Sequence, residues 1–120
     1  LVAATLRAQQ PPMTVKQIMT ELTIPSSDAI FSAAYDTPAN DEQWMAVRRS
    51  AVTLGESGKL LLAADHSGDE EGWVTMARAL MDESQKALEA VDAKDGEALM
   101  QAGDDVYLTC ENCHARYMVR

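Results

Sequence analysis

Apolar and small side chains recur at alternating steps of three and four residues in four separate stretches of this chain. This heptad-like spacing predicts an α-helix that buries one stripe against its neighbours. The predicted inward stripes are Val15, Met19, Leu22, Ser26, Ala29 and Ala33; Trp44, Val47, Ala51, Leu54, Gly58 and Leu61; Trp73, Ala77, Leu80, Ser84, Ala87 and Val91; and Leu99, Gly103, Val106, Cys110, Cys113 and Tyr117.

Helix-breaking residues separate these stretches. They are Pro11-Pro12, Asp36-Thr37-Pro38, Asp65-His66-Ser67-Gly68 and Asp92 to Gly96. Connections this short favour antiparallel neighbours, so we expect an all-α, up-down-up-down four-helix bundle spanning residues 13–120. Within the first helix, Pro25 is expected to produce a kink.

The formal charge of −9 makes nucleic acid and anionic lipid poor partners. No segment approaches the roughly 18 consecutive apolar residues that a membrane helix needs. A protein with a basic docking patch is the partner class that this charge favours. Residues 1–12 are expected to be a flexible arm or the remnant of a leader, with a signal peptide absent from or only partly retained in the chain.

The only two cysteines lie in the string Cys110-Glu111-Asn112-Cys113-His114. This is the CxxCH pattern for covalent attachment of a c-type haem. Each thiol adds to a haem vinyl group as a thioether, and the imidazole takes an axial position on the iron. On a helix, Cys113 and His114 share one face with Cys110, so a single turn provides the required arrangement.

Three other uses of this string compete with haem attachment. A thioredoxin-like CxxC normally sits between a strand and a helix, and no strand pattern is present. Structural zinc takes four ligands, and His66 is the only other histidine. A disulfide, or a pair of buried thiols, gives the adjacent histidine no role.

A four-helix bundle with CxxCH near the chain end resembles the class II c-type cytochromes, the cytochrome c′ family. The resemblance covers about Thr14 to Arg120, and its specific part is CxxCHxxY, Cys110 to Tyr117. Many cytochromes c′ have arginine four residues after the histidine. Here Met118 takes that position, with Arg116 before Tyr117, which puts a proximal role for an arginine in doubt.

The resemblance implies two types of sixth coordination position on the iron. One branch leaves the position open under a bulky apolar residue of the first helix, and a low-spin branch uses a first-helix methionine. Met19 lies on the predicted inward stripe and is the expected ligand; Met13 and His66 are rivals. His66 is expected to be exposed in a polar loop. Tyr117 is expected to pack beside the haem.

These residues predict a periplasmic bacterial electron-transfer protein with one covalent haem, and not an enzyme, since no nucleophile–base constellation is evident. A five-coordinate protein that binds nitric oxide or carbon monoxide is the alternative. A haem-free helical interaction module is a third hypothesis. Dimerisation through the first two helices is common in the family that the chain resembles, which leaves a homodimer open.

Overall fold

The computed structural model describes residues 12–118, most of which belong to four long helices. The first helix consists of α2 (Val15–Ile18), the π-helical turn η1 (Met19–Thr23) and α3 (Ile24–Tyr35), and the others are α4 (Asp41–Ala63), α5 (Glu70–Asp92) and α6 (Gly96–Tyr117). All three interhelical breaks fall where the breaking residues predict them. Residues 1–11, most of the predicted N-terminal arm, lie outside the described residues.

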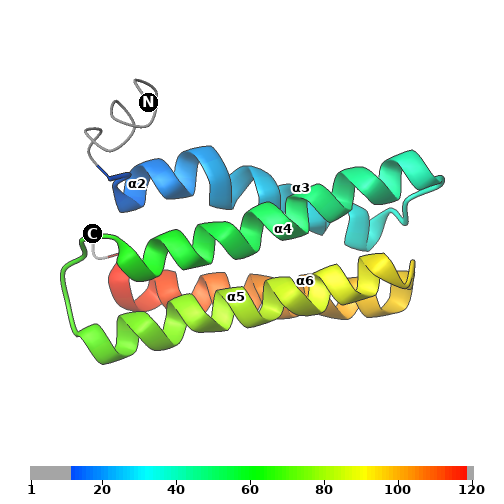
Figure 1. Cartoon of the computed structure of the whole chain (residues 1–120). Helices are drawn as coiled ribbons and strands as arrows, with labels where there is room; N and C mark the ends of the chain where they lie inside the picture. The colour runs from blue at the N-terminus through cyan, green and yellow to red at the C-terminus, as the bar shows by residue number, and fades with distance from the viewer. Residues whose placement is uncertain (1–11, 119–120) are drawn as a thin grey trace, which may run out of the picture.

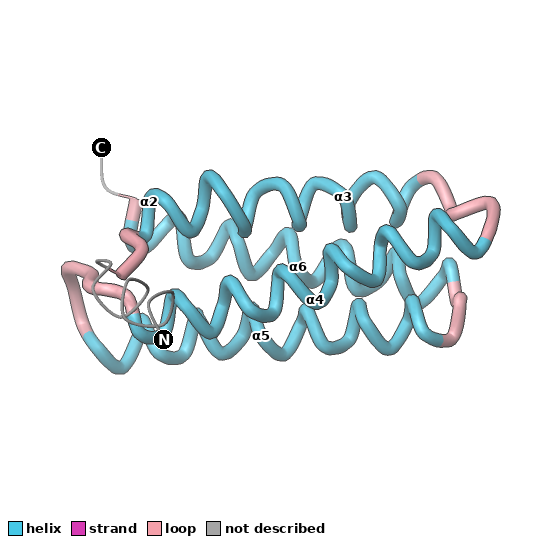
Figure 2. The backbone as a smooth tube through the Cα atoms, turned by 45° about the horizontal axis from the view of Figure 1, so that its top comes forward, coloured by secondary structure: helices cyan, strands magenta, loops and turns pink. Residues whose placement is uncertain are grey.

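Successive helices run in opposite directions, with short loops at the two ends (Figure 1). Each helix packs against two neighbours: α4 lies between α3 and α5, and α6 lies between α5 and α3. Figure 2 shows the same closed arrangement of four helices from a second direction. The prediction of an antiparallel four-helix bundle is confirmed.

Side-chain caps fix the helix starts. At Thr14, the hydroxyl accepts the Gln17 backbone N–H over 3.1 Å and the Gln17 side chain accepts the Thr14 N–H over 2.9 Å, a complete capping box. Asn40, Asp69 and Asp95 cap α4, α5 and α6 in the same way, each accepting a backbone N–H three residues on. The chain therefore specifies its helix boundaries locally.

The predicted stripes of α4 and α5 are buried in full. Trp44 and Trp73 lie in this core, and the Trp73 indole N–H donates to the carbonyl of Leu61 over 2.7 Å. In α6 the first three stripe residues are buried, whereas Cys110, Cys113 and Tyr117 are half-buried. The inward face of α6 is therefore more exposed near the C-terminal end of the helix.

The predicted stripe of the first helix is wrong in part. Ile18 and Ile30, which the prediction omits, are 1% and 0% exposed, while Met19 and Ala29 are only half-buried. The π-helical turn adds one residue to the helix, and after it Ser27 and Ile30 are buried together with the predicted Ser26 and Ala33. Ile18 lies before this turn, so the turn does not account for its burial. This turn ends at Thr23, two residues before Pro25, which has no N–H to donate to the carbonyl four residues earlier. The irregularity that Pro25 predicts therefore takes the form of a widened turn.

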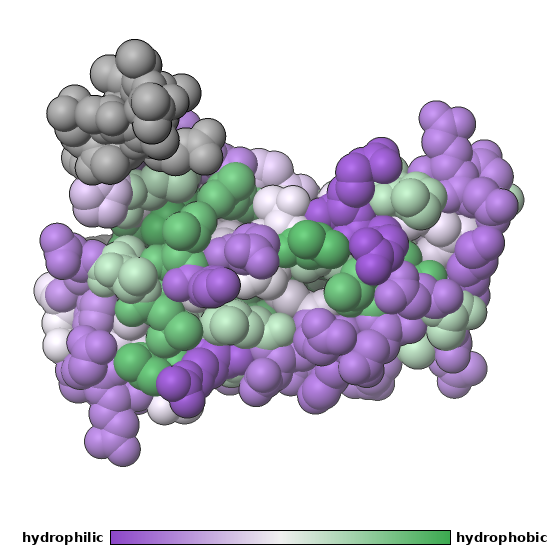
Figure 3. Space-filling view, viewed as in Figure 1, coloured by the Kyte–Doolittle hydropathy of each residue, from purple (hydrophilic) through white to green (hydrophobic). Residues whose placement is uncertain are grey.

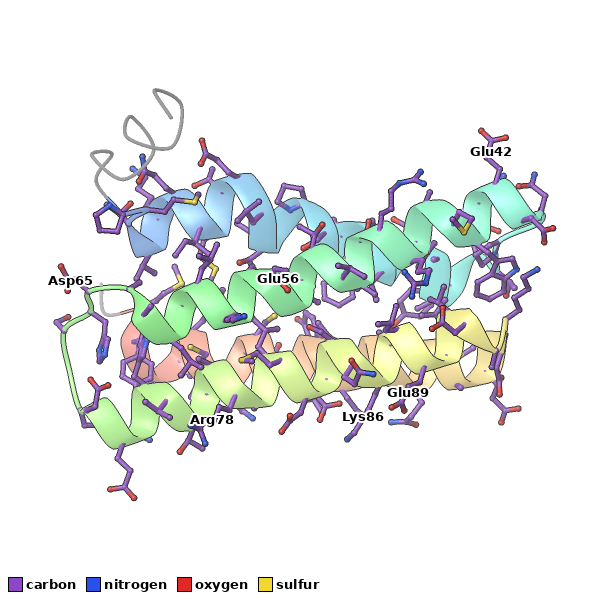
Figure 4. All side chains as sticks on the ribbon, viewed as in Figure 1. Glu42, Glu56, Asp65, Arg78, Lys86 and Glu89 are labelled. Carbon is purple, nitrogen blue, oxygen red and sulfur yellow. The ribbon has the colours of Figure 1, made fainter. Side chains whose placement is uncertain are left out.

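Charged side chains cover the outside of the bundle. The labelled residues in Figure 4, among them Glu42, Arg78 and Glu89, are all exposed. On the face shown in Figure 3, polar residues predominate, and apolar side chains gather over α2 and the adjacent part of α4. Within residues 12–118, no helix combines the length and apolar character that a membrane span needs.

Candidate functional site

The CxxCH string forms part of the last two turns of α6, and its Cys110, Cys113 and His114 are half-buried. All three line one cavity of about 530 Å³ near that end of the bundle. The helical spacing accounts for the shared direction, since residues three and four apart lie on one face. The prediction that a single helical turn presents these three side chains together agrees with this geometry.

The cavity is built by all four helices. Its walls come from the first helix (Met19, Thr23, Ile24, Ser27, Asp28 and Phe31), α4 (Leu61), α5 (Met76 and Leu80) and α6 (Tyr107, Thr109, Cys110, Glu111, Cys113, His114 and Ala115). Its volume falls within the range of about 300 to 1,000 Å³ typical of ligand and cofactor sites. Most of the lining surface is apolar, so a largely apolar group is the kind of occupant that this lining suits.

Both sulfurs are free thiols in this structure, so no disulfide links Cys110 to Cys113. Burial raises the pKa of the Cys110 thiol, and the neighbouring Cys113 raises it further. Burial also raises the pKa of the Cys113 thiol. The two groups are therefore neutral at pH 7, unlike the low-pKa thiol of a thioredoxin-like site, which is activated by nearby positive charge or a helix N-terminus.

A structural metal ion has no support in the part of the chain that the structure describes. Across residues 12–118, no three His, Cys, Asp or Glu side chains converge to hold one. Cys110, Cys113 and His114 instead lie along the wall of a cavity much larger than an ion. This arrangement fits attachment of an extended group better than it fits a zinc cage.

Of the sulfur ligands considered from the sequence, Met19 lines the cavity, and it does so from the π-helical turn. Met13 is half-buried against the core and is not among the lining residues. Met76 of α5 also lines the cavity, although it lies outside the predicted inward stripe of that helix. Its place in the sequence, one residue before the buried stripe residue Ala77, is the signal that the chain offers for this contact.

The expectation that His66 is exposed is wrong. Its side chain is only 9% exposed, and its Nε2 lies 3.0 Å from a carboxylate oxygen of Glu70. The imidazole stacks on the indole of Trp73, with ring centroids 4.4 Å apart. His66 is not among the cavity residues, because this apolar stacking partner holds it at the loop end of the bundle.

Tyr117 also lies outside the cavity lining. Its ring meets Trp73 edge-on at 5.2 Å between centroids, and its hydroxyl donates to Asp69 over 3.1 Å. Arg116 donates to the same carboxylate over 3.0 Å. Both side chains are therefore engaged with the start of α5.

No family model, curated protein or solved structure matches this chain.

The residues present fit a covalently attached haem. Two neutral thiols and an imidazole lie on one helix face, and a thioether from another helix lines the same apolar space. One cavity residue carries an unsatisfied polar atom: the hydroxyl of Thr23 is buried without a hydrogen-bond partner among the described residues. The cavity also has carboxylates, from Asp28 and Glu111, among its lining groups.

Proposed function

We propose that this chain is a c-type cytochrome that carries one haem, bonded through Cys110 and Cys113, and transfers single electrons. One observation supports the proposal most directly: the two thiols and the His114 imidazole line one cavity of about 530 Å³. CxxCH is the attachment pattern for this cofactor, and the cavity provides space for the cofactor beside the motif. The chain's resemblance to class II cytochromes implies the bacterial periplasm as the compartment.

The haem, when bound, supplies an iron that changes its oxidation state by one electron. His114 and Met19 are the proposed axial ligands. A neutral thioether raises the reduction potential relative to a second imidazole. The chain contributes apolar walls, since Leu61, Leu80 and Phe31 all line the cavity.

The proposed partner is a redox protein with a basic docking patch. Two residues that line the cavity, Ile24 and Tyr107, are 48% and 53% exposed, so they extend from the cavity to the surface. The carboxylates of Asp28 and Glu111 lie beside them, in a chain of net charge −9. An apolar mouth with acidic neighbours suits an electrostatically steered encounter with a basic surface.

A five-coordinate haem that binds nitric oxide or carbon monoxide is the second candidate. The observation that favours it is Phe31, a bulky first-helix side chain in the cavity wall. Such a residue over an open iron position is what the resemblance to cytochrome c′ implies for this alternative. The occupancy of the sixth position separates the two functions.

The test is expression of the chain with a haem-maturation system, followed by denaturation and acid–acetone extraction. A c-type haem stays with the polypeptide, gives a pyridine haemochrome spectrum and adds the mass of one haem. The Cys110→Ala, Cys113→Ala double variant is the control and should lose its colour on extraction. A wild-type protein that is colourless after extraction, with the mass of the bare polypeptide, contradicts the proposal.

A further inference from the structure

Asp69 joins the start of α5 to the end of α6. Its carboxylate accepts the backbone N–H of Gly72 over 2.7 Å, which caps α5. The same carboxylate accepts a hydrogen bond from Arg116 over 3.0 Å and from the Tyr117 hydroxyl over 3.1 Å. These last two donors lie two and three residues after His114, so one side chain holds the turn that carries the proposed axial ligand.

Gly72 permits this close approach of the two helices. A β-carbon at Gly72 would lie 2.5 Å from the Tyr117 hydroxyl oxygen and 2.8 Å from Cζ of Arg116. Both distances are shorter than any ordinary contact. A side chain at Gly72 would therefore displace the ends of the Tyr117 and Arg116 side chains from their positions beside Asp69.

The end of α6 needs such support because His114 lies in the final turn, which ends at Tyr117. The last carbonyls of a helix have no intrahelical partner, and helix ends fray. The carbonyl of His114 accepts the N–H of Met118 over 3.0 Å, which is the last backbone bond of the described helix. Beyond that bond, Tyr117 is held by its edge-on contact with Trp73 and by Asp69.

We propose that Asp69 is a positioning residue for His114: by holding Arg116 and Tyr117, it fixes the last turn of α6 and the orientation of the imidazole toward the haem. This inference rests on the proposed function, since it concerns the axial ligand. Under this proposal, Asp69, the last residue of the loop between α4 and α5, influences the reduction potential of the iron.

The experiment uses the haem-loaded protein in its ferric state. The paramagnetically shifted haem-methyl resonances depend on the orientation of the axial ligands, whereas a change in overall stability alone leaves them in place. Tyr117→Phe removes the hydroxyl that Asp69 accepts and keeps the ring. Asp69→Asn keeps a capping oxygen for Gly72 and removes the charge that faces Arg116. We expect both variants to change the spread of the methyl signals, and the midpoint potential to shift with it.

The matched control is Asp92→Asn, which breaks the 2.8 Å pair with Arg48. Asp92 is the last residue of α5, at the opposite end of that helix from Asp69. This variant should have the same haem-methyl resonances as the wild type. If Asp69→Asn is poorly folded, Tyr117→Phe decides, because it removes a single oxygen. A coloured protein whose methyl pattern is the same in wild type, Tyr117→Phe and Asp69→Asn overturns the positioning role alone. A wild type without covalent haem overturns the proposed function, and this role with it.

Discussion

The imidazole of His66 lies flat against the indole of Trp73, with the ring planes 7° apart and the centroids separated by 4.4 Å. Trp73 is itself anchored by its hydrogen bond to the carbonyl of Leu61. The stack therefore ties the loop between α4 and α5 to the core. His66 does not line the cavity, so it is not among the axial ligands that we propose.

Replacing His66 by alanine is expected to lower the free energy of unfolding by about 1 kcal/mol, the size of one aromatic pair. The visible spectrum of the haem-loaded protein should not change, because His66 does not line the cavity. Urea unfolding followed by circular dichroism measures the first effect and absorption measures the second. Loss of the low-spin spectrum in His66→Ala would instead identify this residue as an iron ligand.

Two glycines on α4 should respond to alanine in opposite ways. At Gly58 a β-carbon would lie 2.8 Å from Cγ of Met81 and 3.3 Å from the carbonyl oxygen of Ala77, so α4 and α5 must separate or Met81 must move. At Gly55 the nearest atom is Ser84 Cβ at 3.6 Å, an ordinary contact. Gly58→Ala is expected to destabilise the protein by about 1 to 3 kcal/mol through overpacking. Gly55→Ala is expected to stabilise it by up to about 1 kcal/mol through helix propensity.

Urea titrations of the two glycine variants, run beside the wild type, provide this comparison. The pair is matched, since both sites are helical, both lie on α4 and both gain one methyl group. Equal shifts in the same direction would mean that the α4–α5 spacing is adaptable and that Gly58 has no packing role.

The helix boundaries were predictable because their signals are local. Thr14, Asn40 and the breakers act within a few residues, and they determine where each helix begins whatever surrounds it. The inward face of the first helix was not predictable in the same way. The π-helical turn before Pro25 changes the register of the residues that follow it, and the heptad pattern does not indicate this turn, so the burial of Ile30 does not follow from the pattern.

The candidate site divides along the same line. Cys110, Cys113 and His114 are neighbours in sequence, so one helical turn brings them together without help from the rest of the fold. The other walls come from residues distant in sequence, and Met76 joins them only because α5 packs beside α6. The low exposure of His66 likewise depends on a tertiary contact with Trp73, whereas the polar residues next to it in the sequence predict an exposed side chain.

Acid should weaken the fold through Asp41 and Asp69. A hydrogen bond and the charge of Lys94 lower the pKa of Asp41 below its ordinary value of 3.8. The N–H of Gly72, followed by Tyr117 and Arg116, lowers the pKa of Asp69. A carboxyl group with a lowered pKa contributes stability above its unfolded pKa, and the contribution is lost as the pH falls through the lowered value.

Thermal melts between pH 7 and pH 2 should therefore show little loss of stability from these groups until the pH falls below about 4. Asp41→Asn should start from a lower melting temperature at pH 7 and lose less of it on acidification. Asp65→Asn, in the exposed loop after α4, is the control. If the melting temperature falls equally steeply with acid in wild type and Asp41→Asn, the pair with Lys94 does not contribute to the pH dependence of stability.

Two methionines line the cavity, and the axial ligand should be Met19. Met19→Ala is expected to remove the weak methionine–iron band at the red end of the ferric spectrum and to permit uptake of carbon monoxide by the reduced protein. The midpoint potential should also fall, because a thioether that favours the ferrous state has been removed. Met76→Ala, on the other hand, should keep the band and change only the packing.

The paired methionine variants also decide between the two proposed functions. If Met76→Ala loses the band and Met19→Ala keeps it, the ligand comes from α5. The chain then differs from the low-spin class II cytochromes, which use a methionine of the first helix. If the wild type lacks the band and takes up carbon monoxide at once, the sixth position is open and Phe31 is the side chain to replace next. Met13→Ala, just before the first helix, is the control, since Met13 does not line the cavity. This variant should have the same spectrum as the wild type.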